Sequence, residues 1–179
     1  TPQQLFHNEG GGKLREVGFD MHIAYDDNGR VYSGMGLDWG DVDGDGHDEL
    51  VVNALAQQRY ALYRRAGAAF EYASAETGLA AASRNHSGWG TKLVDIDNDG
   101  RLDLVTAQSH VMDNIERTQP AVAHREPMML LRNVGGRFAD VSARMGEAWL
   151  KPRVARGAAF GGLNNDGLVD VVVVAQQER

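Results

Sequence analysis

The chain of 179 residues contains no cysteine, which excludes disulfide bonds and zinc sites built on thiolates. It also lacks any apolar stretch approaching ~18 residues, so no segment is predicted to span a membrane. Basic residues are few, because 18 Lys and Arg stand against 25 Asp and Glu and the formal net charge is −7. Phosphate contacts need clustered Lys and Arg, so a nucleic-acid partner is not expected.

The signatures of several common catalytic sites are missing too. The sequence has neither a G-x-S-x-G nucleophile elbow nor a zinc-binding H-E-x-x-H pair. The pairs Gly34-x-Gly36 and Gly88-x-Gly90 lack the third glycine of a dinucleotide-binding loop. We therefore predict that the chain is not an enzyme.

An acidic loop occurs twice, at residues 41–49 and 95–103, and recurs in weakened form at 162–170. In the first two copies, oxygen-bearing side chains stand at positions 1, 3, 5 and 9, and a glycine at position 6 permits a sharp turn. This spacing lets one short loop surround a hard cation, and Ca²⁺, which takes about six to eight oxygens, is the favoured ion. The third copy has Gly162 at position 1, so whether it binds an ion stays open. A plain acidic turn without metal is the alternative, since Asp, Asn and Gly all favour turns.

The sequence around the loops distinguishes them from EF-hands. An EF-hand closes its loop with a bidentate Glu at position 12 and then enters a helix. Here position 12 is Val52, Thr106 or Val173, and the closing acid stands at position 9 instead. Each loop leads into a run rich in β-branched residues, which is typical of a strand. We therefore expect a strand, a cation-binding loop and a second strand.

The loops belong to a larger repeat. A pattern of strand, Gly-rich turn and strand precedes each of them, at residues 5–14, 62–70 and 130–138. The chain thus reads as three units, approximately 1–58, 59–127 and 128–179. Four strands per about 50–60 residues suit a propeller blade better than a solenoid rung. The expected fold is all-β, with about three four-stranded blades in a single β-propeller region over 1–179.

These repeats resemble FG-GAP (VCBS-type) repeats, the blades of integrin-α-like β-propellers. They are similar in more detail to the ASPIC/UnbV, or cartilage-acidic-protein, group. The segments that carry the closer similarity are 88–104, 109–111, 125–127, 131–133, 156–161 and 164–167.

The resemblance implies Ca²⁺ as cofactor, with ligands from side chains and from the backbone carbonyl at position 7. In loop order these ligands are Asp41, Asp43, Asp45, His47, Glu49, Asp95, Asp97, Asp99, Arg101, Asp103, Asn164, Asp166, Leu168 and Asp170. Because the third loop departs from the family pattern at Gly162, its ion is expected to be held more weakly.

The expected function is a calcium-stabilised propeller module for interaction or assembly, with a protein partner or self-association. An extracytoplasmic location is favoured, because weak Ca²⁺ modules suit the higher calcium outside cells. The start at Thr1 reads as an internal or processed terminus, so a signal peptide is expected to lie outside this chain.

The sequence allows alternatives for the assembly and for the function. Three blades do not close a propeller, since four to eight blades are typical. The chain is therefore either a fragment of a longer protein or part of a ring completed by other copies, of which two would give six blades. The alternative function is a propeller enzyme or biosynthetic accessory protein of the ASPIC/UnbV type. Its site would lie near the insertion at 108–127, which His110 and His124 flank.

Overall fold

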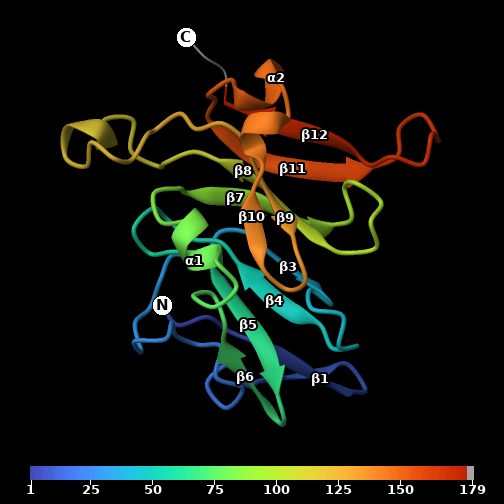
Figure 1. Cartoon of the computed structure of the whole chain (residues 1–179). Coiled ribbons are helices and arrows are strands. Elements are labelled where there is room, and N and C mark those ends of the chain that lie inside the picture. Colours follow the sequence, from blue (N-terminus) through green and yellow to red (C-terminus); the bar gives the residue numbers. More distant parts are fainter. Residues whose placement is uncertain (177–179) are drawn as a thin grey trace.

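The computed structural model describes residues 1–176 and is built of four antiparallel β-sheets (Figure 1). The chain passes from the blue N-terminal hairpin through two larger sheets to the orange and red C-terminal pair. Helices are single short turns: α1 (Leu79–Ala82), η1 (Ile115–Arg117), η2 (Ser142–Arg144) and α2 (Glu147–Leu150). Within residues 1–176, none of them has the length and apolarity needed to cross a bilayer. The predicted all-β class is confirmed.

The first four-stranded sheet has the order β3-β4-β5-β6. Its strands are Leu37–Gly40, Glu49–Val52, Ala61–Ala66 and Ala69–Tyr72. All residues of β4 are buried, which explains why its last three residues form a continuous apolar run and not an alternation. The first acidic loop joins β3 to β4, so the predicted arrangement of strand, loop and strand is confirmed.

The second four-stranded sheet repeats this order as β7-β8-β9-β10. Its strands are Gly88–Val94, Asp103–Gln108, Met129–Asn133 and Phe138–Asp140. The second acidic loop joins β7 to β8, and every residue of β8 is buried. The insertion that follows β8 connects it to β9 at the end of the sheet opposite the loop.

A two-stranded sheet stands at each end of the chain. Strand β1 (Phe6–Gly10) pairs with β2 (Lys13–Glu16), and β11 (Ala155–Gly161) pairs with β12 (Asp170–Ala175). By its repeat position, the first pair corresponds to β5–β6, and the second pair to β3–β4. The described residues thus form two complete blades and two half-blades, an open part of a propeller.

The sheets group the strands differently from the sequence units 1–58, 59–127 and 128–179. The hairpin β5–β6 comes from the second unit but pairs with β4 of the first, where Val51 lies opposite Leu62. In the next sheet β9 likewise pairs with β8. Antiparallel strands that are neighbours in sequence pair without any crossover. Each blade therefore begins with the strand that leads into its acidic loop.

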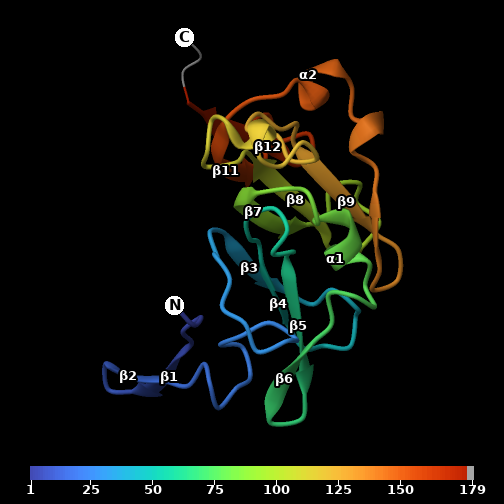
Figure 2. The ribbon, with the colours of Figure 1, turned by 90° about the vertical axis from the view of Figure 1, so that its left-hand side faces the viewer.

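Successive sheets approach one another along their first strands, where β3 contacts β7 and β7 contacts β11 (Figure 2). Glycine makes this close approach possible. A Cβ atom on Gly36 would lie 1.7 Å from the Trp89 carbonyl oxygen, and one on Gly90 would lie 2.3 Å from Ala158 N. Gly157 occupies the same repeat slot, but the nearest atom to its Cβ position is 3.9 Å away. Its neighbourhood is open because no further described sheet follows β11–β12.

One apolar core extends through both four-stranded sheets. Val51 and Leu62 of the first sheet and Leu104 and Leu131 of the second are each 0–1% exposed and belong to the same cluster. Burial of such side chains is worth about 1.5–3 kcal/mol each. The strands that flank the first two acidic loops are therefore held firmly in place.

Candidate metal centres in the acidic loops

All three acidic loops share one backbone conformation. Position 4 is left-handed in each, at Gly44 (φ 80°), Asn98 (φ 57°) and Asn165 (φ 59°). Position 6 is left-handed as well, with φ between 84° and 86° in all three copies, and is always glycine. Left-handed angles are easy for Gly and tolerated by Asn, so the sequence pattern accounts for the turn.

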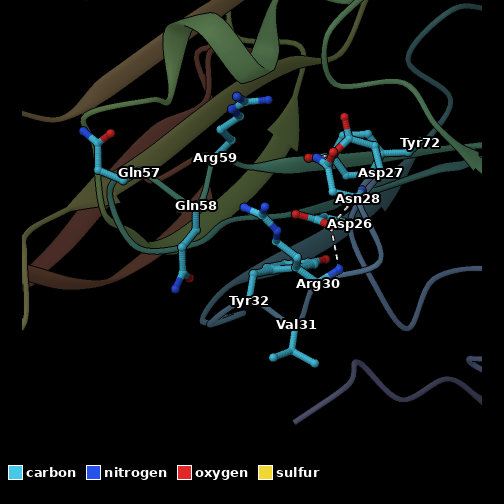
Figure 3. A pocket seen from close by; sticks show the side chains of 10 residues that line it. All are labelled: Asp26, Asp27, Asn28, Arg30, Val31, Tyr32, Gln57, Gln58, Arg59 and Tyr72. Atoms are coloured by element: carbon cyan, nitrogen blue, oxygen red, sulfur yellow. Dashed lines mark hydrogen bonds between the residues drawn. The ribbon is translucent and has the colours of Figure 1, made fainter.

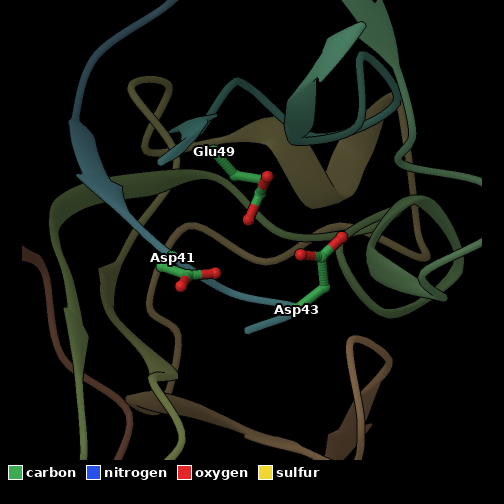
Figure 4. Close-up of side chains that lie close together, drawn as sticks. All are labelled: Asp41, Asp43 and Glu49. Carbon is green, nitrogen blue, oxygen red and sulfur yellow. The ribbon is translucent and has the colours of Figure 1, made fainter. Parts of the chain in front are cut away.

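The first loop gathers three carboxylates. Candidate ligand oxygens of Asp41, Asp43 and Glu49 lie within 4.8 Å of one another, and their carboxylates point toward a shared space (Figure 4). Asp41 also organises the loop, because its oxygens accept N–H bonds from Gly44 (2.7 Å) and Gly46 (3.0 Å). Asp45 lies outside this close group and accepts a bond from the backbone N–H of His47 at 2.8 Å.

Glu49 closes the first loop from inside the protein. It is 1% exposed, and its Oε2 accepts a 2.8 Å bond from Val42 N. Its Oε1 is buried without a hydrogen-bond partner among the described residues. Burial raises the pKa of Glu49, and the nearby Asp43 and Asp45 carboxylates add to this, while backbone N–H groups oppose it. An unsatisfied buried acceptor costs about 1–3 kcal/mol, and more when charged, so a cation fits this position.

The second loop repeats the arrangement with a different subset of acids. Here Asp95, Asp97 and Asp99 lie within 4.8 Å of one another. Asp95 accepts backbone bonds from Asp99 and Gly100, both at 2.9 Å, as Asp41 does in the first loop. The acid at position 9, Asp103, is one methylene shorter than Glu49 and lies outside this close group.

Asp103 is nevertheless as deeply buried as Glu49. It is 0% exposed, and its Oδ1 accepts a 2.7 Å bond from Asn133 N. Its Oδ2 is buried and, among residues 1–176, has no hydrogen-bond partner. Burial raises the pKa of Asp103, and the backbone N–H groups of Asn133 and Ile96 offset this only in part. Both complete loops thus contain a buried carboxylate oxygen that lacks a donor.

Arginine side chains contact both clusters. Arg132 Nη2 lies 2.8 Å from Asp97 Oδ2 and 2.9 Å from Asp99 Oδ2, and Arg64 Nε lies 3.3 Å from Asp43 Oδ2. Burial opposes ionisation of Asp99, but hydrogen bonds from Arg132 and from the Arg101 backbone outweigh it and lower the pKa of this carboxyl.

No sequence motif predicted a role for Arg64 or Arg132, although both occupy the same slot of the hairpin repeat. Arg101 was predicted only as a carbonyl ligand. Its side chain also pairs with Asp99 and donates to the carbonyl oxygen of Asn133 at 3.2 Å.

The third loop adopts the same turn as the other two but does not bring three acids close together. Asp170 Oδ2 accepts a 2.6 Å bond from Leu163 N, as Glu49 does from Val42. Asp166 accepts bonds from the Asn164 amide (2.8 Å) and from Leu168 N (2.9 Å), and the Leu168 bond is the main reason why the pKa of Asp166 is lowered. Across residues 1–176, groups of three or more possible metal ligands occur only in the first and second loops.

The two histidines of the insertion lie side by side, but their contacts are with the backbone. His124 Nδ1 lies 2.9 Å from the His110 carbonyl oxygen, and His110 Nδ1 accepts a 3.1 Å bond from Met112 N. Neither belongs to a possible metal-binding group within the described part of the chain. Glu126, at the end of the insertion, is 2% exposed and lies 2.7 Å from His86 Nδ1. These contacts fix the path of the insertion.

A polar hollow of about 260 Å³ lies at the end of β4 away from the first acidic loop (Figure 3). The acids Asp26 and Asp27 and the arginines Arg30 and Arg59 line it. Arg59 adopts a left-handed φ of 65°, which is uncommon for a residue other than glycine. No sequence motif predicted this hollow, because segments far apart in the chain form it.

The comparison with known families agrees with this geometry. A search of the curated proteins found no match to the chain. Residues 41–106 match the family model of the FG-GAP-like repeat. The match begins with the first residue of the first loop and extends past the second loop, so it includes both carboxylate clusters. The segment 41–106 is therefore an FG-GAP-like repeat.

Proposed function

We propose that the chain is a β-propeller interaction module whose blades are stabilised by Ca²⁺. The observation that carries this proposal is the pair of buried carboxylate oxygens without donors, Glu49 Oε1 and Asp103 Oδ2. Each closes a loop that also holds a close group of acids. A bound cation would satisfy the buried charge and remove the repulsion among the acids.

The chemistry of the donors favours Ca²⁺ over other metals. The clusters offer only oxygen, with neither His nor Cys in them. Ca²⁺ accepts such hard ligands in flexible geometry, whereas Mg²⁺ demands a near-ideal octahedron. The first ion would be held by Asp41, Asp43, Asp45, Glu49 and the His47 carbonyl. The second would be held by Asp95, Asp97, Asp99, Asp103 and the Arg101 carbonyl.

The third loop is proposed as a weaker site. Asn164, Asp166, Asp170 and the Leu168 carbonyl would bind the ion without an acid at position 1. Fewer charged ligands lower Ca²⁺ affinity. This loop is therefore expected to fill only at higher Ca²⁺ concentrations than the other two.

The wider role follows from the repeat. FG-GAP-like repeats support a propeller that binds protein partners, and we propose a non-enzymatic module of the ASPIC/UnbV type acting outside the cytoplasm. Exposed apolar side chains on β12, Val172 (50%) and Val174 (65%), favour association with a further blade. Self-association that completes the propeller is part of this proposal.

Melting curves in excess Ca²⁺ and in chelator test the proposed function. We expect Ca²⁺ to raise the melting temperature by roughly 10–20 °C, because each of the two stronger sites, filled at 100 times its Kd, contributes about 2.7 kcal/mol. Mg²⁺ at the same concentration serves as the control and is expected to have a much smaller effect. Identical curves with Ca²⁺ and with chelator would contradict the proposal.

Removing an arginine that occupies the second cluster is expected to tighten Ca²⁺ binding. Arg132 contacts the same carboxylate oxygens that the ion would use, so Arg132→Met removes a competitor. Exposed ion pairs are weak, so the gain in Ca²⁺ affinity should be modest, roughly two- to fivefold. Calorimetric titration measures this gain. The control is Arg65→Met, because Arg65 bonds to the Gly67 carbonyl and lies over Phe70. An equal gain in both variants would point to net charge alone.

A further inference from the structure

Asn133, the last residue of β9, is a buried amide placed between the two complete acidic loops. It is 0% exposed. Its Nδ2 donates to the carbonyl oxygen of Val42 in the first loop at 2.7 Å and to that of Leu102 in the second at 3.1 Å. Its Oδ1 accepts a 2.8 Å bond from Gly136 N, which fixes the orientation of the amide. The side chain therefore links two sheets through specific polar contacts.

These contacts complete a chain of hydrogen bonds from one closing acid to the other. Glu49 Oε2 accepts from Val42 N at 2.8 Å, and the Val42 carbonyl accepts from Asn133 Nδ2 at 2.7 Å. The backbone N–H of Asn133 then donates to Asp103 Oδ1 at 2.7 Å. The second oxygen of each acid is the one that lacks a donor. Only Val42 and Asn133 thus separate the two acids along this route.

A second contact joins the same parts. A Cβ atom on Gly136 would lie 3.2 Å from the Cβ of Asp43, so the turn after β9 packs against the first loop. The turn and the Asn133 amide move together, because Gly136 N bonds to Asn133 Oδ1. A displacement of Asn133 would therefore shift the proposed ligand Asp43 and the Val42 peptide, whose N–H bonds to the proposed ligand Glu49.

From this arrangement we propose that Asn133 couples the two candidate ion sites, so that Ca²⁺ bound in one loop raises the affinity of the other. The inference rests on the proposed function. An ion in the second loop fixes Asp103, which fixes Asn133 and through it Val42 and Glu49. The first loop is then already ordered when its own ion arrives, and less conformational entropy is lost. Asn133 is a positioning residue and contacts no ion itself.

The direction of the change in affinity for the second ion distinguishes coupling through Asn133 from direct charge interaction between the ions. Two divalent cations repel each other, so direct charge interaction would make the second ion bind more weakly. Coupling through Asn133 makes it bind more tightly. The expected coupling lies in the ~5–150-fold range typical of linked sites.

Calorimetric Ca²⁺ titration of the full chain tests the coupling. Asp41→Asn removes a charged ligand from the first site and Asp95→Asn removes one from the second, so each variant reports the other of the two stronger sites without its partner. We expect both isolated sites to bind at least about fivefold more weakly than the sites of the unmodified chain. In an Asn133→Ala background this difference should disappear. Asn8→Ala is the control, because Asn8 has the same repeat slot on β1 but is exposed, and its Oδ1 accepts a bond from Gly10 N in its own hairpin.

A second measurement avoids substitution of Asn133. In the Asp41→Asn chain only the second site can fill strongly, yet Ca²⁺ is expected to slow hydrogen exchange at Val42 N more than at amides of the β1–β2 hairpin. Equal slowing at both places overturns the route through Asn133, as does full coupling in a folded Asn133→Ala chain. Ca²⁺ uptake with independent sites overturns the coupling and leaves the proposed function standing. Absence of Ca²⁺ uptake by the unmodified chain overturns both.

Discussion

Gly36→Ala is expected to destabilise the protein by more than about 3 kcal/mol, because the new methyl group would meet backbone and not a movable side chain. Its Cβ would lie 1.7 Å from the Trp89 carbonyl oxygen and 2.9 Å from Asn53 Nδ2. Relief requires the first and second sheets to separate along β3 and β7, which breaks their shared core. For a chain of this size the melting temperature should fall by roughly 6–12 °C. Thermal or urea unfolding measures the loss.

The control for this substitution is Gly157→Ala, at the same repeat slot of the C-terminal sheet β11–β12. The nearest atom to a Cβ there is Val174 Cβ at 3.9 Å, an ordinary contact distance. We expect a change within about 1 kcal/mol, since Gly to Ala costs nothing where the backbone and the space allow it. If both variants lose the same stability, the close approach of the sheets is not what requires glycine at position 36.

The double variant Glu49→Gln with Asp103→Asn is expected to abolish most of the response to Ca²⁺. Two sites filled at 100 times Kd would contribute about 5 kcal/mol, or roughly 10–20 °C in melting temperature, to the unmodified chain. Each amide keeps an oxygen to accept the bond from Val42 N or Asn133 N. Each also removes a buried charge whose second oxygen has no donor. Stability in chelator should therefore be unchanged or higher, while stability in Ca²⁺ should fall.

Differential scanning calorimetry in Ca²⁺ and in chelator measures the two expected changes in stability. Asp48→Asn is the matched control, because Asp48 is an exposed acid of the first loop that stands at none of the four oxygen positions. It should keep the full Ca²⁺ response. A double variant that loses as much stability in chelator as in Ca²⁺ would indicate that the two acids stabilise the fold through their protein contacts and not through a bound ion.

The local part of the candidate site could be predicted from the sequence because it depends on spacing within nine residues. Glycine at position 6 and Gly or Asn at position 4 fix the turn, and the turn brings Asp41 and Asp43 close to Glu49. The absence of Glu at position 12 and the apolar runs after each loop correctly predicted strands instead of helices. Such signals are short-range, so one sequence contains them.

The rest depends on how the sheets dock. Asn133 reaches Val42 only because β9 of one sheet lies against the loop of another, and no periodicity encodes that contact. Arg132 reaches Asp97 and Asp99 within one sheet, because β9 pairs with β8 directly after the second loop, and the loop spacing does not encode that pairing. The sequence units grouped each hairpin with the acidic loop that follows it, because a repeat pattern has the same period wherever its first strand is placed. In the structure β5 pairs with β4, so the hairpin β5–β6 shares a sheet with the loop that precedes it.

The pairing of strands with their neighbours in sequence also bears on the order in which the protein folds. Every strand pair within a sheet joins consecutive strands, so the relative contact order inside a sheet is low and its formation is fast. The bond from Asn133 to Val42 joins residues 91 positions apart. A ribosome that releases the chain from its N-terminus delivers all four strands of the first sheet by Tyr72, well before Asn133 has been synthesised. All four strands of the first sheet would therefore be available to pair before Asn133, the residue that bonds the first acidic loop to the second sheet, has been synthesised.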